Sequence, residues 1–471
     1  MSAPTTPKQP DLVSVTSINR DGSRYFIHPA DVSGPWARAR SLVAWGLMLL
    51  FFALPWIPVG GFPAVFLDTQ TRNFHVFGFH FAIQDFWLLF FCLTGLGFSL
   101  FFLTALFGRL WCGWTCPYIL PLDHLYRRVE RWIEGDSVAR RRLDQAPWTA
   151  GKIAKWVTKH AIYLALSAII AHAFLAYFVS IPRLYSFIQA GPMKHHFAFG
   201  VAMFLTFVLW FCWGYFREQF CIIMCPYGRL QSALTDDDTV TVGYDRLRGE
   251  PRGPAGKVEG DCIDCRRCVN VCPTGIDIRN GLQLECVACT ACIDACDAVM
   301  TKIGKPKGLI RYDSLNGFSG KKRRVLRPRI YVYGALGALG LAAFSTVVAL
   351  KASPFTVTIG RVSGPGYSVD AEVVRNSFIV RVKNKRQQPA TITVSLATGA
   401  PDGYRVAEET ASFTVPPLEE VARTCSLIAP LGSYQGQGQL IIQFASSDGG
   451  KVVKKVPFAG PNPAAVKRPT P

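Results

Sequence analysis

The chain has 471 residues, of which 50% are hydrophobic and 13% aromatic, and its 51 Lys and Arg against 32 Asp and Glu give a formal net charge of +19. The aromatic content excludes a disordered chain, and the absence of a short repeat excludes collagen-like and coiled-coil architectures. A mean hydropathy of +0.22 is too high for a set of ordinary soluble domains. Because the cations flank apolar stretches and form no single patch, nucleic acid is excluded as a partner.

Five apolar stretches are long enough to cross the hydrocarbon core of a bilayer. A transmembrane helix needs about 20 predominantly apolar residues, and none of these stretches has a charged residue at its centre. Trp and Tyr lie near their ends, as they do at membrane interfaces. The sequence therefore predicts five transmembrane helices, at residues 42–59, 83–107, 161–181, 197–216 and 330–350.

The Lys and Arg residues indicate how these spans are oriented. They concentrate before the first span, in the loop after the second span and before the fifth span, and they include Arg40, Arg127 and Arg140. Cytoplasmic loops carry the excess of Lys and Arg. The N-terminus, this Arg-rich loop and the segment between the fourth and fifth spans are therefore predicted to be cytoplasmic. The odd number of spans then places the residues after Lys351 on the opposite side.

Two short motifs of cysteine and proline follow the second and fourth spans. They are Cys112-Gly-Trp-Thr-Cys116-Pro117 and Cys221-Ile-Ile-Met-Cys225-Pro226. Cysteines at positions i and i+4 share one helix face, and a following proline ends or kinks the helix. If the two helices are neighbours, four thiols converge at the cytoplasmic membrane edge. Soft thiolates suit Cu(I) or a further iron–sulfur cluster, and these two interpretations stay open.

Eight cysteines between the fourth and fifth spans form two runs of identical spacing, Cys262-x2-Cys265-x2-Cys268-x3-Cys272 and Cys286-x2-Cys289-x2-Cys292-x3-Cys296. In two-cluster ferredoxins, three cysteines of a run bind one [4Fe–4S] cluster and the fourth binds the other cluster. Zinc sites usually have two separated cysteine pairs for each ion. Two [4Fe–4S] clusters are therefore predicted. The first is held by Cys262, Cys265, Cys268 and Cys296, and the second by Cys286, Cys289, Cys292 and Cys272.

The chain changes character after the fifth span. Short β-branched segments, separated by Gly, Pro and Asn, predict a small β-sandwich. Its one thiol, Cys425, is interpreted as a core cysteine, with a reactive or metal-binding role as the alternative. The predicted strands cover residues 378–383, 390–396, 412–415, 440–444 and 451–458.

With these motifs in view, the chain resembles the FixG/CcoG (RdxA) family, accessory proteins of cytochrome c oxidase in bacteria that have cbb3-type oxidases. The most specific parts are the two membrane-edge motifs, the eight cysteines, Tyr244-Asp-x2-Arg-Gly-Glu-Pro-Arg-Gly253 and Gly308-Leu-Ile-Arg-Tyr312. The resemblance implies a polyferredoxin of the bacterial inner membrane with a periplasmic immunoglobulin-like domain. It also implies a cupric reductase that reduces Cu(II) to Cu(I), with a copper donor, copper chaperones and cbb3-type oxidase assembly factors as partners. The resemblance thus implies copper as the substrate, and we expect Cys112, Cys116, Cys221 and Cys225 to be its catalytic and binding residues.

The predicted fold class is a polytopic α-helical membrane protein with a bacterial-type 2[4Fe–4S] ferredoxin domain and a C-terminal immunoglobulin-like β-sandwich. The predicted order is a cytoplasmic tail, four spans with the Arg-rich loop, a cytoplasmic ferredoxin-like domain, the fifth span and the periplasmic domain. Their boundaries are 1–41, 42–220, 221–329, 330–351 and 352–471.

The sequence contains no motif for a nucleotide cofactor that could supply electrons. Neither a Gly-x-Gly-x-x-Gly motif after a strand nor a Walker A motif is present, so a separate donor must supply electrons. The alternative function is a quinol-oxidising subunit, similar to NapH, that feeds a periplasmic partner. NapH-like proteins share the cysteine motifs but lack the fifth span and the sandwich, which favours the accessory protein. A third alternative is an assembly scaffold whose clusters do not turn over.

Overall fold

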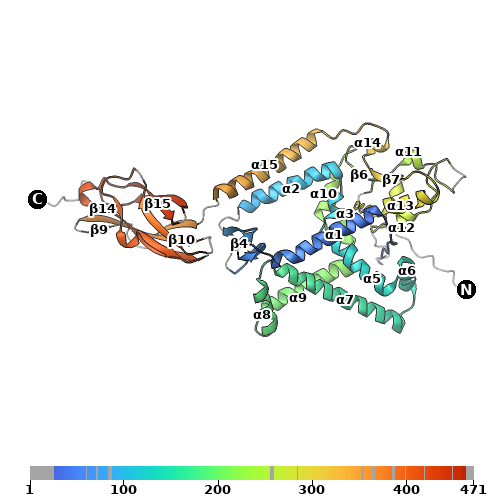
Figure 1. Cartoon of the computed structure of the whole chain (residues 1–471), viewed down its shortest axis with the longest axis horizontal. Helices are drawn as coiled ribbons and strands as arrows, with labels where there is room; N and C mark the ends of the chain where they lie inside the picture. The colour runs from blue at the N-terminus through green and yellow to red at the C-terminus, as the bar shows by residue number, and fades with distance from the viewer. Residues whose placement is uncertain are drawn as a thin grey trace. The chain divides into compact units, whose positions relative to one another are not determined.

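The computed structural model describes residues 26–462 apart from 60, 71–72, 83–86, 255–258, 284, 352–354, 363–365, 371, 385–387, 398, 418 and 448. The chain divides into two compact units, one of residues 1–77 and 81–344 and one of residues 78–80 and 345–471 (Figure 1). The first 25 residues of the predicted N-terminal tail lie outside the described residues.

Five described helices are long and apolar enough to cross a membrane, which confirms the predicted number. Two of them continue past the α-helical part, α1 to Trp56 and α9 to Phe216. The helices are α1 (Pro35–Ala53), α2 (Leu88–Phe107), α7 (Ala150–Leu175), α9 (His196–Trp210) and α15 (Pro328–Lys351).

The predicted boundaries of two spans were wrong. Helices α1 and α7 begin at Pro35 and Ala150, before the predicted starts at 42 and 161. Polar and charged residues outside the hydrocarbon region can still be helical, so hydropathy does not mark where these helices begin. Helix α7 ends at Leu175, and Ser180, with an extended ψ of 144°, begins α8 (Ile181–Ala190). Pro182 fits the first turn of α8, where a helix needs no backbone N–H. The start of the predicted second span, at 83–86, lies outside the described residues.

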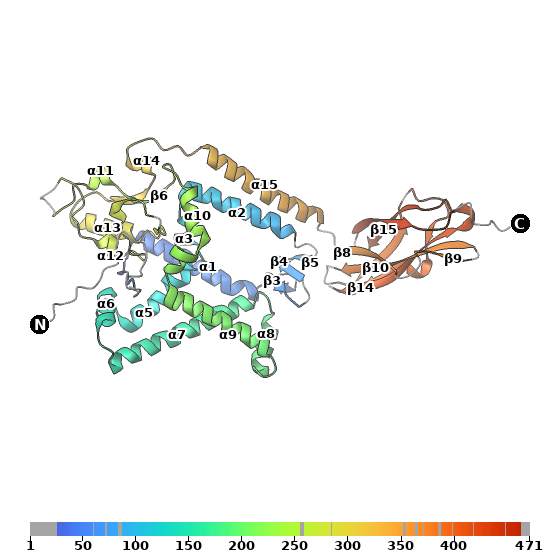
Figure 2. The same ribbon diagram turned by 180° about the vertical axis from the view of Figure 1, so that it is seen from behind.

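Helices α2 and α15 lie side by side in both views and touch at their backbones (Figures 1 and 2). A Cβ atom on Gly340 would lie 2.7 Å from the Cα of Gly95, and one on Gly337 would lie 3.0 Å from the Oγ of Ser99. Small residues permit such close approach between membrane helices.

Short elements connect the spans. Strands β3 (Val65–Asp68) and β4 (Asn73–Val76) form an antiparallel hairpin between α1 and α2, which the sequence analysis did not predict. The Arg-rich segment forms α5 (Arg127–Glu134) and α6 (Ser137–Gln145). Around the first membrane-edge motif lie α3 (Leu110–Trp114), α4 (Ile119–Pro121) and a π-helical turn, η3 (Leu122–Tyr126).

The segment with eight cysteines is closed by two paired strands. Antiparallel β6 (Thr241–Tyr244) and β7 (Ile310–Asp313) bring its two ends together. Between them lie α11 (Arg246–Gly249), α12 (Arg267–Asn270) and α13 (Ala291–Lys302), and α14 (Leu315–Phe318) follows. Helix α12 contains Cys268, and α13 contains Cys292 and Cys296, so each run continues directly into a helix.

The C-terminal unit is a sandwich of two antiparallel sheets. Their strand orders are β12-β14-β10-β8, with β9 also paired to β10, and β13-β11-β15-β16. All five predicted strands are present within β10 (Val373–Asn384), β11 (Ala390–Leu396), β13 (Ser412–Val415), β15 (Gly438–Ser446) and β16 (Lys451–Phe458). Four strands were not predicted, β8 (Phe355–Arg361), β9 (Ser368–Val369), β12 (Arg405–Val406) and β14 (Glu420–Pro430).

The longest unpredicted strand, β14, shows why the sequence pattern did not reveal every strand. Its first half is largely exposed and its second half is buried without alternation, so it lacks the period of two that marks a half-buried strand. Cys425 lies in this strand with 1% of its surface exposed, within the core cluster of the sandwich. The interpretation of Cys425 as a core cysteine is confirmed.

Candidate redox centre

Two neighbouring cavities lie inside the segment with eight cysteines. Cys268 lines both of them, so they are adjacent. One is lined by Cys262, Cys265, Cys268 and Cys296. The other is lined by Cys272, Cys286, Cys289 and Cys292. We call the cavity lined by Cys262, Cys265, Cys268 and Cys296 the outer cavity, and the cavity lined by Cys272, Cys286, Cys289 and Cys292 the inner cavity. The fourth cysteine of each run thus lines the cavity of the other run, as the predicted ligand sets require.

The backbone of the two runs repeats one unusual conformation. Asp264 and Arg266, which flank Cys265, have φ of 50° and 52°, and Ala288 and Thr290, which flank Cys289, have φ of 52° and 65°. A left-handed conformation costs a residue other than glycine about 1–2 kcal/mol. Such turns point successive N–H groups into a concavity that binds anions, including iron–sulfur centres. Both runs therefore fit a negatively charged cluster.

The thiols are not arranged for single metal ions. Across the described part of the chain, no three Cys, His, Asp or Glu side chains come close enough to hold one ion. Tetrahedral zinc needs four sulfur atoms about 2.3 Å from a single point. Thiols spread around a cavity suit a cluster of several atoms better, so the arrangement disfavours the zinc alternative.

Burial controls the protonation of these thiols. It raises the pKa of Cys268, Cys286 and Cys296 to about 12 and that of Cys289 to about 11. These thiols are therefore protonated at neutral pH until a metal centre displaces the protons.

The membrane-edge motifs differ locally from the prediction. Cys112 lies in α3, but this helix ends at Trp114, before Cys116. Cys221 lies in a π-helical turn, η5 (Phe220–Met224), and Cys225 precedes α10 (Pro226–Leu234). The prediction that each cysteine pair shares one α-helical face was therefore wrong. The expected break at proline is present, because Pro226 begins a new helix.

Long-range packing still brings the four membrane-edge thiols into one neighbourhood. Burial raises the pKa of Cys221, and charge on Cys116, Cys112 and Cys225 raises it further. Cys112, Cys116 and Cys221 also pack against a buried cluster that contains Cys289 of the second run, with Cys292 at its margin. The membrane-edge thiols thus lie against the inner cavity without converging on one point.

Gly113 forms a close contact between the membrane-edge motifs and the second cysteine run. A Cβ atom on Gly113 would lie 2.5 Å from the carbonyl oxygen of Ala288 and 2.7 Å from that of Val287. The same Ala288 oxygen accepts a hydrogen bond from the Tyr312 hydroxyl at 3.3 Å, and that hydroxyl accepts one from Trp114 Nε1 at 3.2 Å. Only glycine permits this approach, and the sequence analysis missed its role.

We expect Gly113→Val to destabilise the protein by about 1–3 kcal/mol, because the added side chain would overlap two backbone oxygens. Thermal unfolding and the iron content of the purified chain measure the effect. Gly97→Ala in α2 is the control, since nothing lies within 4 Å of its new Cβ atom. An unchanged melting temperature in Gly113→Val would contradict the contact.

A buried ionic bridge also joins the two systems. Arg40 Nε donates to the carbonyl oxygen of Gly113 at 2.6 Å, and Arg40 Nη2 lies 2.5 Å from Asp123 Oδ2. Asp123 Oδ1 lies 2.6 Å from Arg127 Nη1, and Arg127 Nη2 donates to the Pro273 carbonyl at 3.0 Å. The bridge thus runs from the residue after Cys112 to the residue after Cys272. The sequence analysis used Arg40 and Arg127 only as loop cations and did not predict that both are buried and paired.

Glu130 is the centre of a second buried ionic group. Its carboxylate lies 3.0 Å from Arg217 Nη1 and 3.2 Å from Arg140 Nη1, and it accepts a hydrogen bond from Tyr163 at 2.9 Å. Burial alone would raise the pKa of Glu130, but Arg217, Lys159 and the other cations lower it to about 2. Arg140 is therefore also buried and paired.

We expect Glu130→Gln to destabilise the protein by about 3–5 kcal/mol at pH 7, because it leaves buried cations unpaired. A depressed carboxyl pKa stabilises the fold above the unfolded pKa of about 4.3, and this stabilisation is lost as pH falls towards 2. The difference in melting temperature between the wild type and Glu130→Gln should therefore shrink over that range. Exposed Glu259→Gln is the control, and a difference independent of pH would contradict the assignment.

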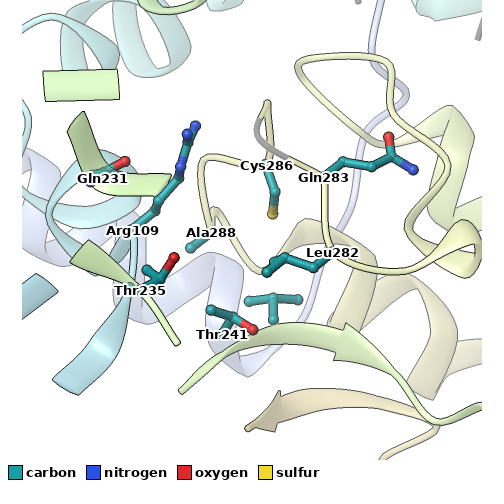
Figure 3. Close-up of a pocket in the computed structure, with 10 residues that line it drawn as sticks. Arg109, Gln231, Thr235, Thr241, Leu282, Gln283, Cys286 and Ala288 are labelled. Carbon is teal, nitrogen blue, oxygen red and sulfur yellow. The ribbon is translucent and has the colours of Figure 1, made fainter. Parts of the chain in front are cut away.

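A small pocket lies between the membrane-edge motifs and the second run. Figure 3 shows Arg109, Gln231 and Thr235 on one side of it and Cys286 and Leu282 opposite. The buried Gln231 amide donates to Cys112 Sγ at 3.5 Å. The Arg109 charge lowers the pKa of both Cys112 and Cys286, against the larger effect of burial. The sequence analysis singled out neither Arg109 nor Gln231 for the site.

Comparison with known proteins identifies the family. A family model described as a 4Fe–4S dicluster domain matches residues 216–315, and one described as the IG-like fold at the C-terminus of FixG matches residues 346–461. Nitrogen fixation protein FixG of Rhizobium meliloti is 34% identical over 421 residues, which cover 79% of each chain. Proteins RdxB and RdxA of Cereibacter sphaeroides are 36% and 34% identical, over 88% of this chain and 91% of each relative. The chain belongs to the FixG/RdxA family.

As a member of the FixG/RdxA family, the protein is an iron–sulfur electron-transfer protein with a dicluster domain and an immunoglobulin-like domain. The matched dicluster segment begins at residue 216 and therefore includes Cys221 and Cys225 together with the eight clustered cysteines. The predicted resemblance and fold class are confirmed.

Proposed function

We propose that this FixG/RdxA-family protein is a cupric reductase of the bacterial inner membrane, which reduces Cu(II) to Cu(I) for the assembly of cbb3-type cytochrome c oxidase. The observation that carries the proposal is the packing of Cys112, Cys116 and Cys221 against the second cysteine run. The proposed copper ligands and a proposed cluster ligand, Cys289, thereby belong to one packed cluster of the chain.

Two sets of four cysteines are proposed to hold two [4Fe–4S] clusters, one in each cavity. When bound, the clusters store and release single electrons. The left-handed residues beside Cys265 and Cys289 turn backbone N–H groups towards each site. Gly113 and the bridge from Arg40 to Arg127 hold the inner cavity against the membrane-edge thiols.

Cys112, Cys116, Cys221 and Cys225 are proposed to bind the substrate copper. Since no three of these described side chains lie close enough to hold one ion, copper binding would have to draw them together. Thiolates are soft ligands and select Cu(I) over harder ions, and their buried surroundings favour the lower charge of Cu(I). Gln231 positions the sulfur of Cys112. The chemical step adds one electron to Cu(II) to form Cu(I), and no atom is transferred.

The proposed orientation follows from the cations around the spans. The N-terminus and the dicluster domain would be cytoplasmic, and the immunoglobulin-like domain periplasmic. Copper would be reduced in the cytoplasm before it is exported, with a copper donor, chaperones and oxidase assembly factors as partners.

The pocket in Figure 3 supports a second candidate function. It lies beside Cys286, close to the end of the apolar helix α2, and apolar residues such as Leu282 and Val242 line it together with Arg109 and Gln231. The second candidate is therefore a quinol-oxidising subunit that passes electrons to a periplasmic partner.

The test uses full-length protein purified without oxygen and reduced with dithionite. After removal of dithionite, Cu(II) is added together with a chelator specific for Cu(I). We expect bleached iron–sulfur absorbance to return as Cu(I) appears, one Cu(I) for each electron. The second candidate would be favoured if the reduced protein does not reduce Cu(II) and the oxidised protein is rapidly reduced by a soluble menaquinol analogue.

A further inference from the structure

The outer cavity is the more open of the two to water. Cys265, which lines it, is the only exposed cysteine in the described part of the chain, and the other seven of the two runs are buried or half-buried. The inner cavity is covered by the membrane-edge motif through Gly113. A water-soluble electron donor can therefore come nearest to the cysteine system at Cys265.

Two cations without an ion-pair partner among the described residues follow this cysteine in the sequence. Arg266 and Arg267 follow Cys265 directly, are exposed, and line the outer cavity. Within the described residues, neither guanidinium group makes an ion pair or a side-chain hydrogen bond. We call Cys265, Arg266 and Arg267 the Cys265 patch.

Two acidic residues near the patch share one buried arginine. Exposed Asp264 forms an ion pair with the buried Arg279. The other end of Arg279 lies 2.6 Å from Asp277 Oδ2. Among the exposed charged residues beside Cys265, Arg266 and Arg267 outnumber Asp264, so the charge offered to an incoming partner is positive.

We propose that the Cys265 patch docks an acidic, water-soluble one-electron carrier protein, which is the separate donor that the chain requires. The proposal rests on the proposed function for the destination of the electrons. Complementary charge steers such encounters and raises association rates by factors of about 10 to 1,000 at low salt. Each reduced carrier is oxidised by one electron and each Cu(II) gains one electron, so two encounters supply two Cu(I) and no proton moves.

Two alternative roles would give different results. In the first, Arg266 and Arg267 serve only to balance the negative charge of a cluster in the outer cavity. Their removal would then shift the midpoint potential or the iron content. Alternatively, a membrane quinol could deliver electrons through the pocket beside Cys286, and the patch would then be irrelevant to reduction.

The experiment measures reduction of the oxidised full-length protein by reduced flavodoxin, an acidic carrier used as the probe, in an anaerobic stopped-flow instrument. The variant is Arg266→Glu with Arg267→Glu, and Lys321→Glu with Lys322→Glu is a control of equal charge change at exposed residues before α15. At low salt we expect the patch variant to lose at least tenfold in second-order rate and in flavodoxin affinity. The control should lose less than twofold.

Three further results support the proposal together. High salt should slow the wild type and leave the patch variant nearly unchanged, because exposed charges are screened. Reduction by dithionite, iron content and midpoint potential should match the wild type. Arg266→Lys with Arg267→Lys should restore most of the rate. If the Glu pair loses iron, Arg266→Gln with Arg267→Gln is judged by the same criteria.

Wild-type rates and affinity in the patch variant would overturn the proposal, as would reduction by a menaquinol analogue but not by flavodoxin. A changed midpoint potential with an unchanged affinity would assign the two arginines to charge balance alone. Protein that flavodoxin reduces through the patch, but that does not reduce Cu(II), would refute the proposed function and leave the docking surface standing.

Discussion

Replacement of Cys112, Cys116, Cys221 and Cys225 together by Ser is expected to abolish Cu(II) reduction while the protein keeps about eight irons. The four thiols lie in one neighbourhood, and Cys112, Cys116 and Cys221 pack against the second run, outside both cysteine-lined cavities. Their removal therefore takes away the soft ligands for copper without removing a predicted cluster ligand. The measurement combines Cu(I)-chelator absorbance with iron and sulfide analysis of anaerobic protein.

The control for the four thiols is Cys92→Ser, a half-buried cysteine within α2 that belongs to neither motif. It should reduce Cu(II) at the wild-type rate. If the quadruple variant also keeps the wild-type rate, copper must be reduced at another site. Loss of iron together with activity would instead assign the four thiols to a third cluster.

The replacement Cys272→Ser is expected to damage the cluster of the inner cavity, and Cys296→Ser that of the outer cavity. Each residue lines the cavity of the opposite run, so each variant should lose up to half of the iron. Because the membrane-edge thiols pack against the inner cavity, Cys272→Ser should also slow Cu(II) reduction more than Cys296→Ser does. Iron analysis and electron paramagnetic resonance of the reduced proteins measure both effects.

Protein that contains zinc and no acid-labile sulfide would contradict both cluster assignments. Cys425→Ser is a useful comparison, because this thiol is buried in the sandwich core and belongs to the other unit. It should keep the full iron content.

Much of the fold was predictable because its signals are local. Apolar length predicted five spans, and short β-branched segments between Gly, Pro and Asn predicted five strands of the sandwich. Strand β14 was missed because its burial does not alternate. The starts of helices α1 and α7 were predicted too late, because hydropathy reports the hydrocarbon boundary and backbone hydrogen bonding extends beyond it.

The cysteine spacing by itself determined which thiols share a cavity, because three cysteines within seven residues have few ways to surround one site. Only the tertiary structure decided how the membrane-edge thiols meet the second run. Arg40 reaches Gly113 across 73 positions of sequence, and Arg127 reaches Pro273 across 146. Such contacts depend on how helices pack, and neither an arginine nor a glycine carries a local signal for a partner so distant in the chain.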